Sequence, residues 1–241
     1  MRKTLTSALA LAVTDGDNAQ WSTASEVNPS PVEADVAYVG ANRSDGNRSN
    51  HTVSLPAGVA TGDTLVLFMT SNSISNTVIT PVGWSVLQSE DGSNFRARAW
   101  TRTATADDIG SSVTVSTSGF EKSDLTVAAY RGSGGSSVGA SDGLLVNGSN
   151  FTHTTPSVNV AGPGAWLVSY WAEKSTGAIS WTPPPGQSLR SGSDSSGGGK
   201  VSAILADSGG PVATGTRGAL VATTDVATTR VAMFSVVIEV G

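Results

Sequence analysis

From Val36 onward, apolar residues recur in short runs that Gly, Pro, Asn and Asp separate. Short apolar runs with alternating polar positions, bounded by turn-forming residues, are typical of β-strands. Strands are therefore predicted at Asp35–Ala41, His51–Leu55, Thr64–Thr70, Trp84–Ser89, Arg96–Ala104, Ser112–Thr117 and Ser123–Arg131. The predicted fold class is all-β, with an antiparallel β-sandwich as its architecture.

The segment "RARAWTRTAT" shows the alternation most plainly. Because successive side chains of a strand point to opposite faces, Ala97 and Ala99 share one face. Arg96, Arg98 and Trp100 share the other face. We expect this arginine-bearing face to be solvated, with Trp100 covered by the apolar stems of the arginine side chains.

The first half of the chain is echoed in the second half. Residues 51–68 read "HTVSLPAGVATGDTLVLF", and residues 153–170 read "HTTPSVNVAGPGAWLVSY". In the same order, "YVGAN" is answered by "SVGAS", "PVGWSVL" by "PPGQSLR", "VTVST" by "LVATT" and "LTVAAY" by "VAMFSV". The repeated order indicates an internal duplication, with one copy in residues 35–132, the other in residues 136–241, and about seven strands in each.

Such a duplication allows two architectures. If the strands of both copies enter two common sheets, residues 35–241 form a single jelly-roll-like antiparallel β-sandwich. If each copy closes alone, the chain forms two tandem Ig-like sandwiches, which the linker-like "GSGGSS" between the copies favours. We favour the single sandwich, because the C-terminal run "MFSVVIEV" is apolar on both faces and requires cover on both.

Residues 1–34 are predicted to form an extended N-terminal arm. The part from Thr14 to Glu33 is polar and lacks the periodicity that a folded element requires. The first residues, Met1–Val13, have two interpretations, a secretory signal peptide or the start of a retained arm. The short apolar stretch and the poor cleavage pattern favour a retained arm that lies on the body of the protein or on a partner.

Composition narrows the classes of partner. The 241 residues include 14 Lys and Arg against 19 Asp and Glu, a formal net charge of −5, so no nucleic-acid partner is expected. No apolar run approaches the roughly 18 residues of a membrane span, so no membrane insertion is expected. The absence of cysteine excludes disulfides and thiolate metal sites, and it favours a bacterial or phage origin.

The sequence shows no constellation of residues for catalysis. Its two histidines, His51 and His153, stand at equivalent positions of the two copies, and we interpret them as serving the same turn, for example by hydrogen-bonding a backbone carbonyl. Glu121 and Asp124 lack the alternate spacing that places two carboxylates on one face of a strand, as in a glycoside hydrolase. We therefore predict a protein that is not an enzyme and has no catalytic residue, cofactor or metal ion.

Tryptophans are the remaining candidates for a binding site. Trp84, Trp100 and Trp181 lie in the β region, and Trp84 and Trp181 flank turns at matching places of the two copies. An exposed set of such rings would suit a sugar, so these three residues are candidate glycan contacts. Tryptophan beside a turn also commonly fills the end of a sandwich core.

The series of motifs resembles a known family. The segments "SLPAGVATGDTLVLF", "PVGWSVL", "RARAWTRTATADDIGSSVTV", "DLTVAAYRG" and "SWTPPPGQ" resemble, in this order, a β-sandwich domain of actinobacteria and their phages. That domain occurs in phage minor tail and structural proteins and in secreted surface proteins. The resemblance covers residues 36–241 and implies no active site, because the motifs carry no known catalytic residues.

The resemblance implies a phage virion structural protein, either a capsid decoration protein or a small tail component. We expect the arm to bind other capsid or tail proteins, the chain to form a homo-oligomer in the assembly, and the sandwich to face solvent on the virion surface. The alternative is a secreted, extracellular carbohydrate-binding or adhesive surface module of a bacterium. That alternative requires a cleaved leader and contacts with host-surface glycans.

Overall fold

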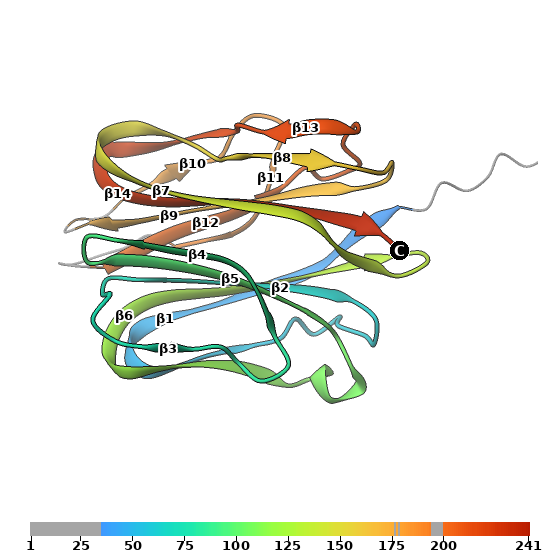
Figure 1. Cartoon of the computed structure of the whole chain (residues 1–241), viewed down its shortest axis with the longest axis horizontal. Helices are drawn as coiled ribbons and strands as arrows, with labels where there is room; N and C mark the ends of the chain where they lie inside the picture. The colour runs from blue at the N-terminus through green and yellow to red at the C-terminus, as the bar shows by residue number, and fades with distance from the viewer. Residues whose placement is uncertain (1–34, 176, 178, 194–199) are drawn as a thin grey trace, which may run out of the picture. The chain divides into compact units, whose positions relative to one another are not determined.

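Antiparallel strands make up most of the structure, a computed structural model that describes residues 35–175, 177, 179–193 and 200–241 (Figure 1). The first half contains β1 (Val36–Ser54), β2 (Thr64–Ser71), β3 (Val78–Ile79), β4 (Ser85–Gly92), β5 (Phe95–Thr103), the 3-10 helix η1 (Ala106–Asp108) and β6 (Ser112–Gly132). The second half contains β7 (Ser136–Thr154), β8 (Ser157–Val160), β9 (Trp166–Ser175), β10 (Trp181–Thr182), β11 (Ser188–Gly192), β12 (Lys200–Asp207), β13 (Gly215–Gly218) and β14 (Val221–Val240). The predicted arm, residues 1–34, lies outside the described residues.

Each half builds one antiparallel sheet, and the strand order is the same in both. Sheet 1 has the order β1-β6-β2-β5-β4, with β3 also paired to β6. Sheet 2 has the corresponding order β7-β14-β9-β12-β11, with β10 also paired to β14, while β8 and β13 form a separate pair. The predicted sandwich of two similar halves is confirmed. The strands of the two copies do not intercalate, because each sheet draws all its strands from one half (Figure 1).

The longest antiparallel strand pairs, β1–β6 and β7–β14, are bent. Strand β1 joins the two predicted strands Asp35–Ala41 and His51–Leu55, and β6 likewise joins Ser112–Thr117 and Ser123–Arg131. The polar stretch between the two parts of β1 has the composition of a loop, yet it stays paired with β6 up to a register shift between Arg48 and Asn50. We call this shift and its counterpart in β7 the bends. Beyond each bend, the strand pair turns back over the outer face of its own sheet.

The two sheets face each other across an inner core to which both halves contribute. Val66 and Phe68 of β2 point into this core. The ring of Phe68 stacks on that of Tyr170 from β9, with centroids 4.7 Å apart and planes at 6°. Phe234 of β14 stacks on both rings, at centroid distances of 6.0 and 6.2 Å. These fully buried rings are part of the apolar contact that holds one half on the other.

Each sheet also has an apolar outer face. Leu65, Leu67 and Met69 of β2 point away from the inner core and pack against Val53 and Val115, which lie beyond the bends of β1 and β6. In sheet 2 the corresponding outer core contains Trp171, Ile204, Ala206, Ala222, Val231 and Met233. Burial on both faces explains why the central strands are apolar at successive positions rather than at alternate ones.

The prediction that the arginine-bearing face of β5 is solvated is wrong. Trp100 is 1% exposed and belongs to the outer core of sheet 1. The buried guanidinium of Arg96 donates hydrogen bonds to the carbonyl oxygens of Ile74 and Asn76 and to the carboxylate of Asp91. The loop before β3 supplies those carbonyls, a tertiary contact that the alternation of β5 alone does not contain.

A buried aspartate on each sheet accepts a hydrogen bond from a tyrosine of the other sheet. The hydroxyl of Tyr130 in β6 donates to Oδ2 of Asp207 in β12 at 3.1 Å. Arg190 of β11 donates to the same carboxylate through Nε at 2.7 Å and Nη2 at 2.9 Å. In the opposite direction, the hydroxyl of Tyr170 in β9 donates to Oδ1 of Asp124 in β6 at 3.5 Å. We call these two contacts the cross-sheet hydrogen bonds.

Both aspartates are fully buried, so their charges need several donors. Arg43 donates to Oδ2 of Asp124 at 2.8 Å, and Thr126 donates to Oδ1 at 2.8 Å. Burial raises the pKa of Asp124, and the charge of Arg43 opposes that rise. Burial also raises the pKa of Tyr130 and of Tyr170 well above the usual value, so both hydroxyls keep their protons and remain donors.

Side chains also bridge the edges of the two sheets. Gln88 on β4 donates to the carbonyl oxygen of Ser141 on β7 at 2.9 Å. On the opposite side, the guanidinium of Arg190 on β11 lies 4.1 Å from the ring centroid of Tyr38 on β1. Contacts of this kind protect edge strands, whose free N–H and C=O groups would otherwise pair with other chains.

Replacement of Tyr130 by Phe tests the cross-sheet hydrogen bond to Asp207. We expect the free energy of unfolding to fall by about 1–3 kcal/mol, because a buried carboxylate loses a donor. Tyr38→Phe is the matched control, and it should change stability by less than about 0.5 kcal/mol because its ring still stacks on Arg190. Urea denaturation measures both changes, and equal losses in the two variants would contradict a specific role for Tyr130.

Candidate functional site

The two histidines lie inside the equivalent bends of β1 and β7. His51 and His153 are each 2% exposed. The backbone of the residue three positions earlier, Arg48 or Asn150, acts on the pKa of each histidine, while Nε2 of His51 has no hydrogen-bond partner among the described residues. The prediction that both histidines serve the same turn of the two copies is therefore confirmed.

Both imidazoles are neutral at pH 7. Burial lowers the pKa of His51 and of His153, and the charge of Arg48 lowers that of His51 further. Neutral rings can pair with hydroxyl groups, and each ring does so: Nδ1 of His51 lies 2.5 Å from the hydroxyl oxygen of Ser123, and Nε2 of His153 lies 3.0 Å from that of Thr228. Each histidine thus links the strand segments on the two sides of its bend.

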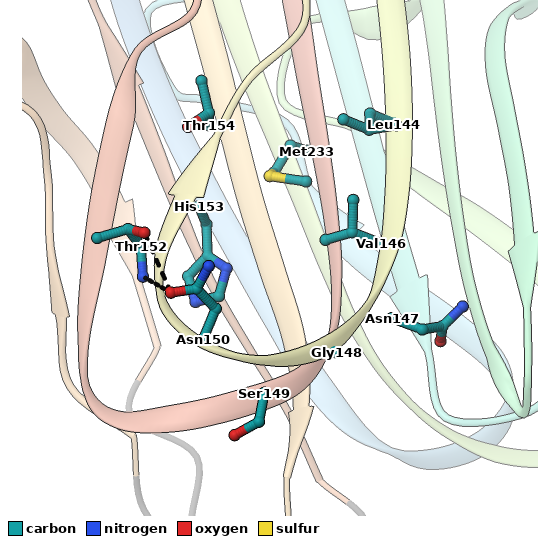
Figure 2. Close-up of a pocket in the computed structure, with 10 residues that line it drawn as sticks. All are labelled: Leu144, Val146, Asn147, Gly148, Ser149, Asn150, Thr152, His153, Thr154 and Met233. Atoms are coloured by element: carbon teal, nitrogen blue, oxygen red, sulfur yellow. Dashed lines mark hydrogen bonds between the residues drawn. The ribbon is translucent and has the colours of Figure 1, made fainter.

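The bend of β7 encloses a hollow of about 330 Å³ (Figure 2). The residues that line it are Leu144, Val146, Asn147, Gly148, Ser149, Asn150, Thr152, His153, Thr154 and Met233. Figure 2 shows Leu144, Val146 and Met233 along one side and Asn150 and Thr152 on the other. One wall is therefore apolar and the other offers hydroxyl, amide and backbone groups, a combination that suits a small amphipathic ligand group.

The turn at the base of the hollow is held in place locally. Oδ1 of Asn150 accepts hydrogen bonds from the backbone N–H groups of Phe151 at 2.8 Å and Thr152 at 3.2 Å, and from the Thr152 hydroxyl at 3.1 Å. Asparagine commonly closes turns in this way. Gly148 has a φ of +133°, a conformation that favours glycine. The hollow is thus preformed, and all its lining residues are uncharged at pH 7.

The structure separates the three tryptophans predicted as glycan contacts. Trp84 and Trp100 lie together in the outer core of sheet 1, at 7% and 1% exposure. Trp181 lies in the second half, partly buried, with its ring edge-on to His153 at 5.5 Å and its indole N–H donating to the Ser202 hydroxyl at 3.1 Å. The three indoles fill two cores and do not form one exposed platform. Glycan contact by any of them stays a prediction.

The two ends of the body, residues 35–241, meet at one turn. The backbone N–H of Gly241 donates to the carbonyl oxygen of Gly135 at 2.9 Å. The N–H of Ser133 donates to the carbonyl oxygen of Asp35 at 3.3 Å. Both contacts involve the turn between β6 and β7, whereas the bends lie at the far ends of β1 and β7 (Figure 1). The chain therefore enters the body at the end opposite to the bends.

Carboxylates approach one another where β4 lies beside β7. Partial burial raises the pKa of Glu90, and the charge of Asp142 adds to that rise. Within the described ranges, no cluster of three or more His, Asp and Glu side chains could hold a metal ion. The described part of the chain also contains no helix that is long and apolar enough to cross a membrane.

Sequence reasoning did not identify Asp124 and Asp207 as contacts between the halves, nor the hollow in β7. A weak signal for the aspartates exists, because each adjoins an apolar run, "LTVAAY" after Asp124 and "AILA" before Asp207. An acidic residue beside a buried strand needs a partner, but the sequence does not name that partner. The hollow has no such signal, since it results from the path of the bend.

The comparisons with known proteins identify no relative. The chain matches no protein-family model, no curated protein and no solved structure at a significant level. The resemblance to the β-sandwich domain of actinobacteria and their phages therefore rests on the order of the sequence motifs alone.

The buried histidines predict a stability that declines below pH 6.5, the usual pKa of histidine. Since burial lowers the pKa of His51 and His153, the unfolded chain binds more protons than the folded chain below that pH. The free energy of unfolding then falls until the lowered pKa is reached, and levels off beyond it. Urea denaturation from neutral pH to about pH 5 measures this decline.

The double variant His51→Gln, His153→Gln serves as the control for this decline. The difference between the variant and the unmodified protein isolates the histidines from Asp124, whose raised pKa acts in the opposite direction. We expect the free energy of unfolding of the double variant to depend less on pH. The same slope in both proteins would show that the histidines do not cause the decline.

Trp100→Ala tests the core position of a predicted glycan contact. We expect the free energy of unfolding to fall by about 3–5 kcal/mol, because the change leaves a large cavity in the outer core of sheet 1. Trp181→Ala should cause a smaller loss, since its indole is only partly buried. Chemical denaturation measures both, and a stable Trp100→Ala variant would contradict the burial of this indole.

Proposed function

We propose that the chain is a non-enzymatic structural protein of a phage virion, either a capsid decoration protein or a small tail component. Residues 1–34 anchor it to other virion proteins, and the body projects into solvent at the virion surface. The observation that carries the proposal is that the two ends of the body differ. The chain enters at Asp35, beside Gly241, and the two bends lie at the opposite end.

A projecting body needs to be rigid, and the contacts between the halves supply that rigidity. The inner core and both cross-sheet hydrogen bonds join the halves across their whole interface. The buried carboxylates of Asp124 and Asp207 are each paired with an arginine, which offsets the cost of burying their charges. The order of motifs, which resembles that of phage structural proteins, supports the same function.

The arm supports an assembly role through its composition. A polar segment without apolar periodicity does not bury enough surface to fold alone, and such segments often become ordered on a partner. Attachment at one end of the body leaves the bend end free. Homo-oligomers in virions follow closed symmetry, so the proposal includes several copies of the chain in the assembly.

A secreted adhesive or carbohydrate-binding module is the second candidate function. Phe120 and Phe151, close to the bends of β6 and β7, are 75% and 53% exposed, which favours it. Exposed aromatic rings at the free end of a rigid body could contact a cell-surface partner. In this function Met1–Val13 would act as a cleaved leader.

Deletion of residues 1–34 tests the virion function. We expect the shortened protein to keep the urea midpoint of the full chain but to lose co-sedimentation with particles from the source, because the anchor is gone. A chain with residues 1–34 in scrambled order is the matched control, and it should also fail to bind. Full binding by the shortened protein would refute the anchor.

The N-terminal sequence of the protein from its source separates the two candidates. An intact Met1 on a particle supports the virion function. A chain that begins just beyond Val13 and occurs free in the medium supports the secreted function instead.

A further inference from the structure

The two bends share a glycine with positive φ but differ in strand pairing and in the side chains that they hold. Gly46 and Gly148 occupy equivalent positions, five residues before His51 and His153, with φ values of +147° and +133°. A Cβ atom on Gly46 would lie 2.9 Å from Nε and 3.0 Å from Nη2 of Arg48. A Cβ atom on Gly148 would meet nothing within 4 Å. The space beside the glycine, which the exposed Arg48 side chain occupies in the first half, is thus open in the second.

The contacts of Arg48 show what this space accepts. Nη2 of Arg48 donates to the carbonyl oxygen of Asp45 at 3.0 Å, and Nη1 donates to the hydroxyl of Ser44 at 3.4 Å. Both acceptors are uncharged oxygens at the base of the bend. The residue equivalent to Asp45 is Asn147, which lines the hollow, so a backbone carbonyl stands at the corresponding place in β7.

The second half also provides a surface for an aliphatic stem. Asn42 and Ser44 in the bend of β1 are replaced in β7 by Leu144 and Val146. Met233 lies beside them (Figure 2). Apolar contact with methylene groups stabilises the long side chains that carry a charged head. The bend of β7 therefore combines an apolar wall with oxygen acceptors, and it lacks the residue that fills the bend of β1.

The charges around the hollow permit a cation. His153 is neutral at pH 7, so it does not repel one. Arg230 is the nearest basic residue along β14, but it lies three positions from Met233 and hence on the opposite face of the strand. The formal net charge of the chain is −5, which favours approach of a cation at low ionic strength.

We propose that the hollow in the bend of β7 binds the arginine side chain of another polypeptide, with the guanidinium over Gly148 and the methylene groups against Leu144 and Val146. The site lies in the body and does not depend on residues 1–34. Residues 147–150 at its rim are exposed at the end of the body farthest from Asp35, where a partner chain has access. Arg48 serves as the internal example of the bound group.

The direct test is an NMR titration of the full chain with N-acetyl-L-arginine N-methylamide, which mimics an arginine within a polypeptide. We expect saturable shifts of the backbone amides of Gly148 and Asn150. The citrulline analogue has the same shape without the charge, and it should bind at least about tenfold more weakly. Equal binding of both compounds, or no saturable shift at these amides, would overturn the proposal.

Variants of the two bends test whether positions 48 and 150 are equivalent. Asn150→Arg copies the first half into the second and should abolish binding. Leu144→Trp fills the hollow without altering the turn at Asn150, and it should also abolish binding. It replaces Asn150→Arg as the test if that variant does not fold. Arg48→Asn empties the first bend but leaves Asn42 and Ser44 in place of the apolar wall, so no saturable shift is expected at Gly46. Unchanged binding in both Asn150→Arg and Leu144→Trp would overturn the proposal.

Free L-arginine distinguishes the source of the ligand. Its charged amino and carboxylate groups are absent from an arginine inside a chain, and the hollow offers no charged partner to either. We expect it to bind more weakly than the capped compound. Tighter binding of free L-arginine would show that the site takes a small metabolite and would overturn the assignment to a polypeptide.

Discussion

The packing of sheet 1 on sheet 2 is the constraint on which the rest of the structure depends. Phe68, Tyr170 and Phe234 stack in the middle of the inner core and are fully buried. Aromatic rings bury about 150–250 Å² each, and at roughly 25 cal/mol per Å² each ring contributes several kcal/mol. The cross-sheet hydrogen bonds contribute less energy, but they fix the position of one sheet on the other. A slip would deprive a buried aspartate of one of its donors.

The bent strand pairs β1–β6 and β7–β14 follow from the same constraint. A sheet that buries one face against its partner still has an apolar outer face, and no α-helix is present among the described elements to cover it. The chain covers it with the far limbs of its own longest strands, which is why β1, β6, β7 and β14 are so long. Neutral histidines suit the inside of the bends, because a neutral ring pairs with hydroxyl groups without bringing a charge into the interior.

Duplication explains both the likeness and the difference of the halves. The glycines and histidines of the bends are retained in both copies, since the backbone path requires them. The side chains between them have diverged: the exposed Arg48 lies against Gly46 in one bend, whereas Asn150 in the other closes the turn with its own backbone neighbours. The bend of β1 therefore holds a side chain of its own beside its glycine, whereas the bend of β7 keeps an open hollow. The inner core has diverged in the same way, with Tyr170 supplying a hydroxyl that Phe68 lacks.

By itself, the sequence determined the all-β class, most of the strands, the division into two copies and the shared role of His51 and His153. Those features depend on local periodicity, on turn-forming residues and on repeated motifs, all of which are properties of neighbouring positions. Tertiary structure alone decided that Arg96 and Trp100 are covered, that two pairs of predicted strands are single bent strands, and that Asp124 and Asp207 meet tyrosines of the opposite sheet. Each of these depends on residues far apart in the chain, whose proximity is set by sheet packing.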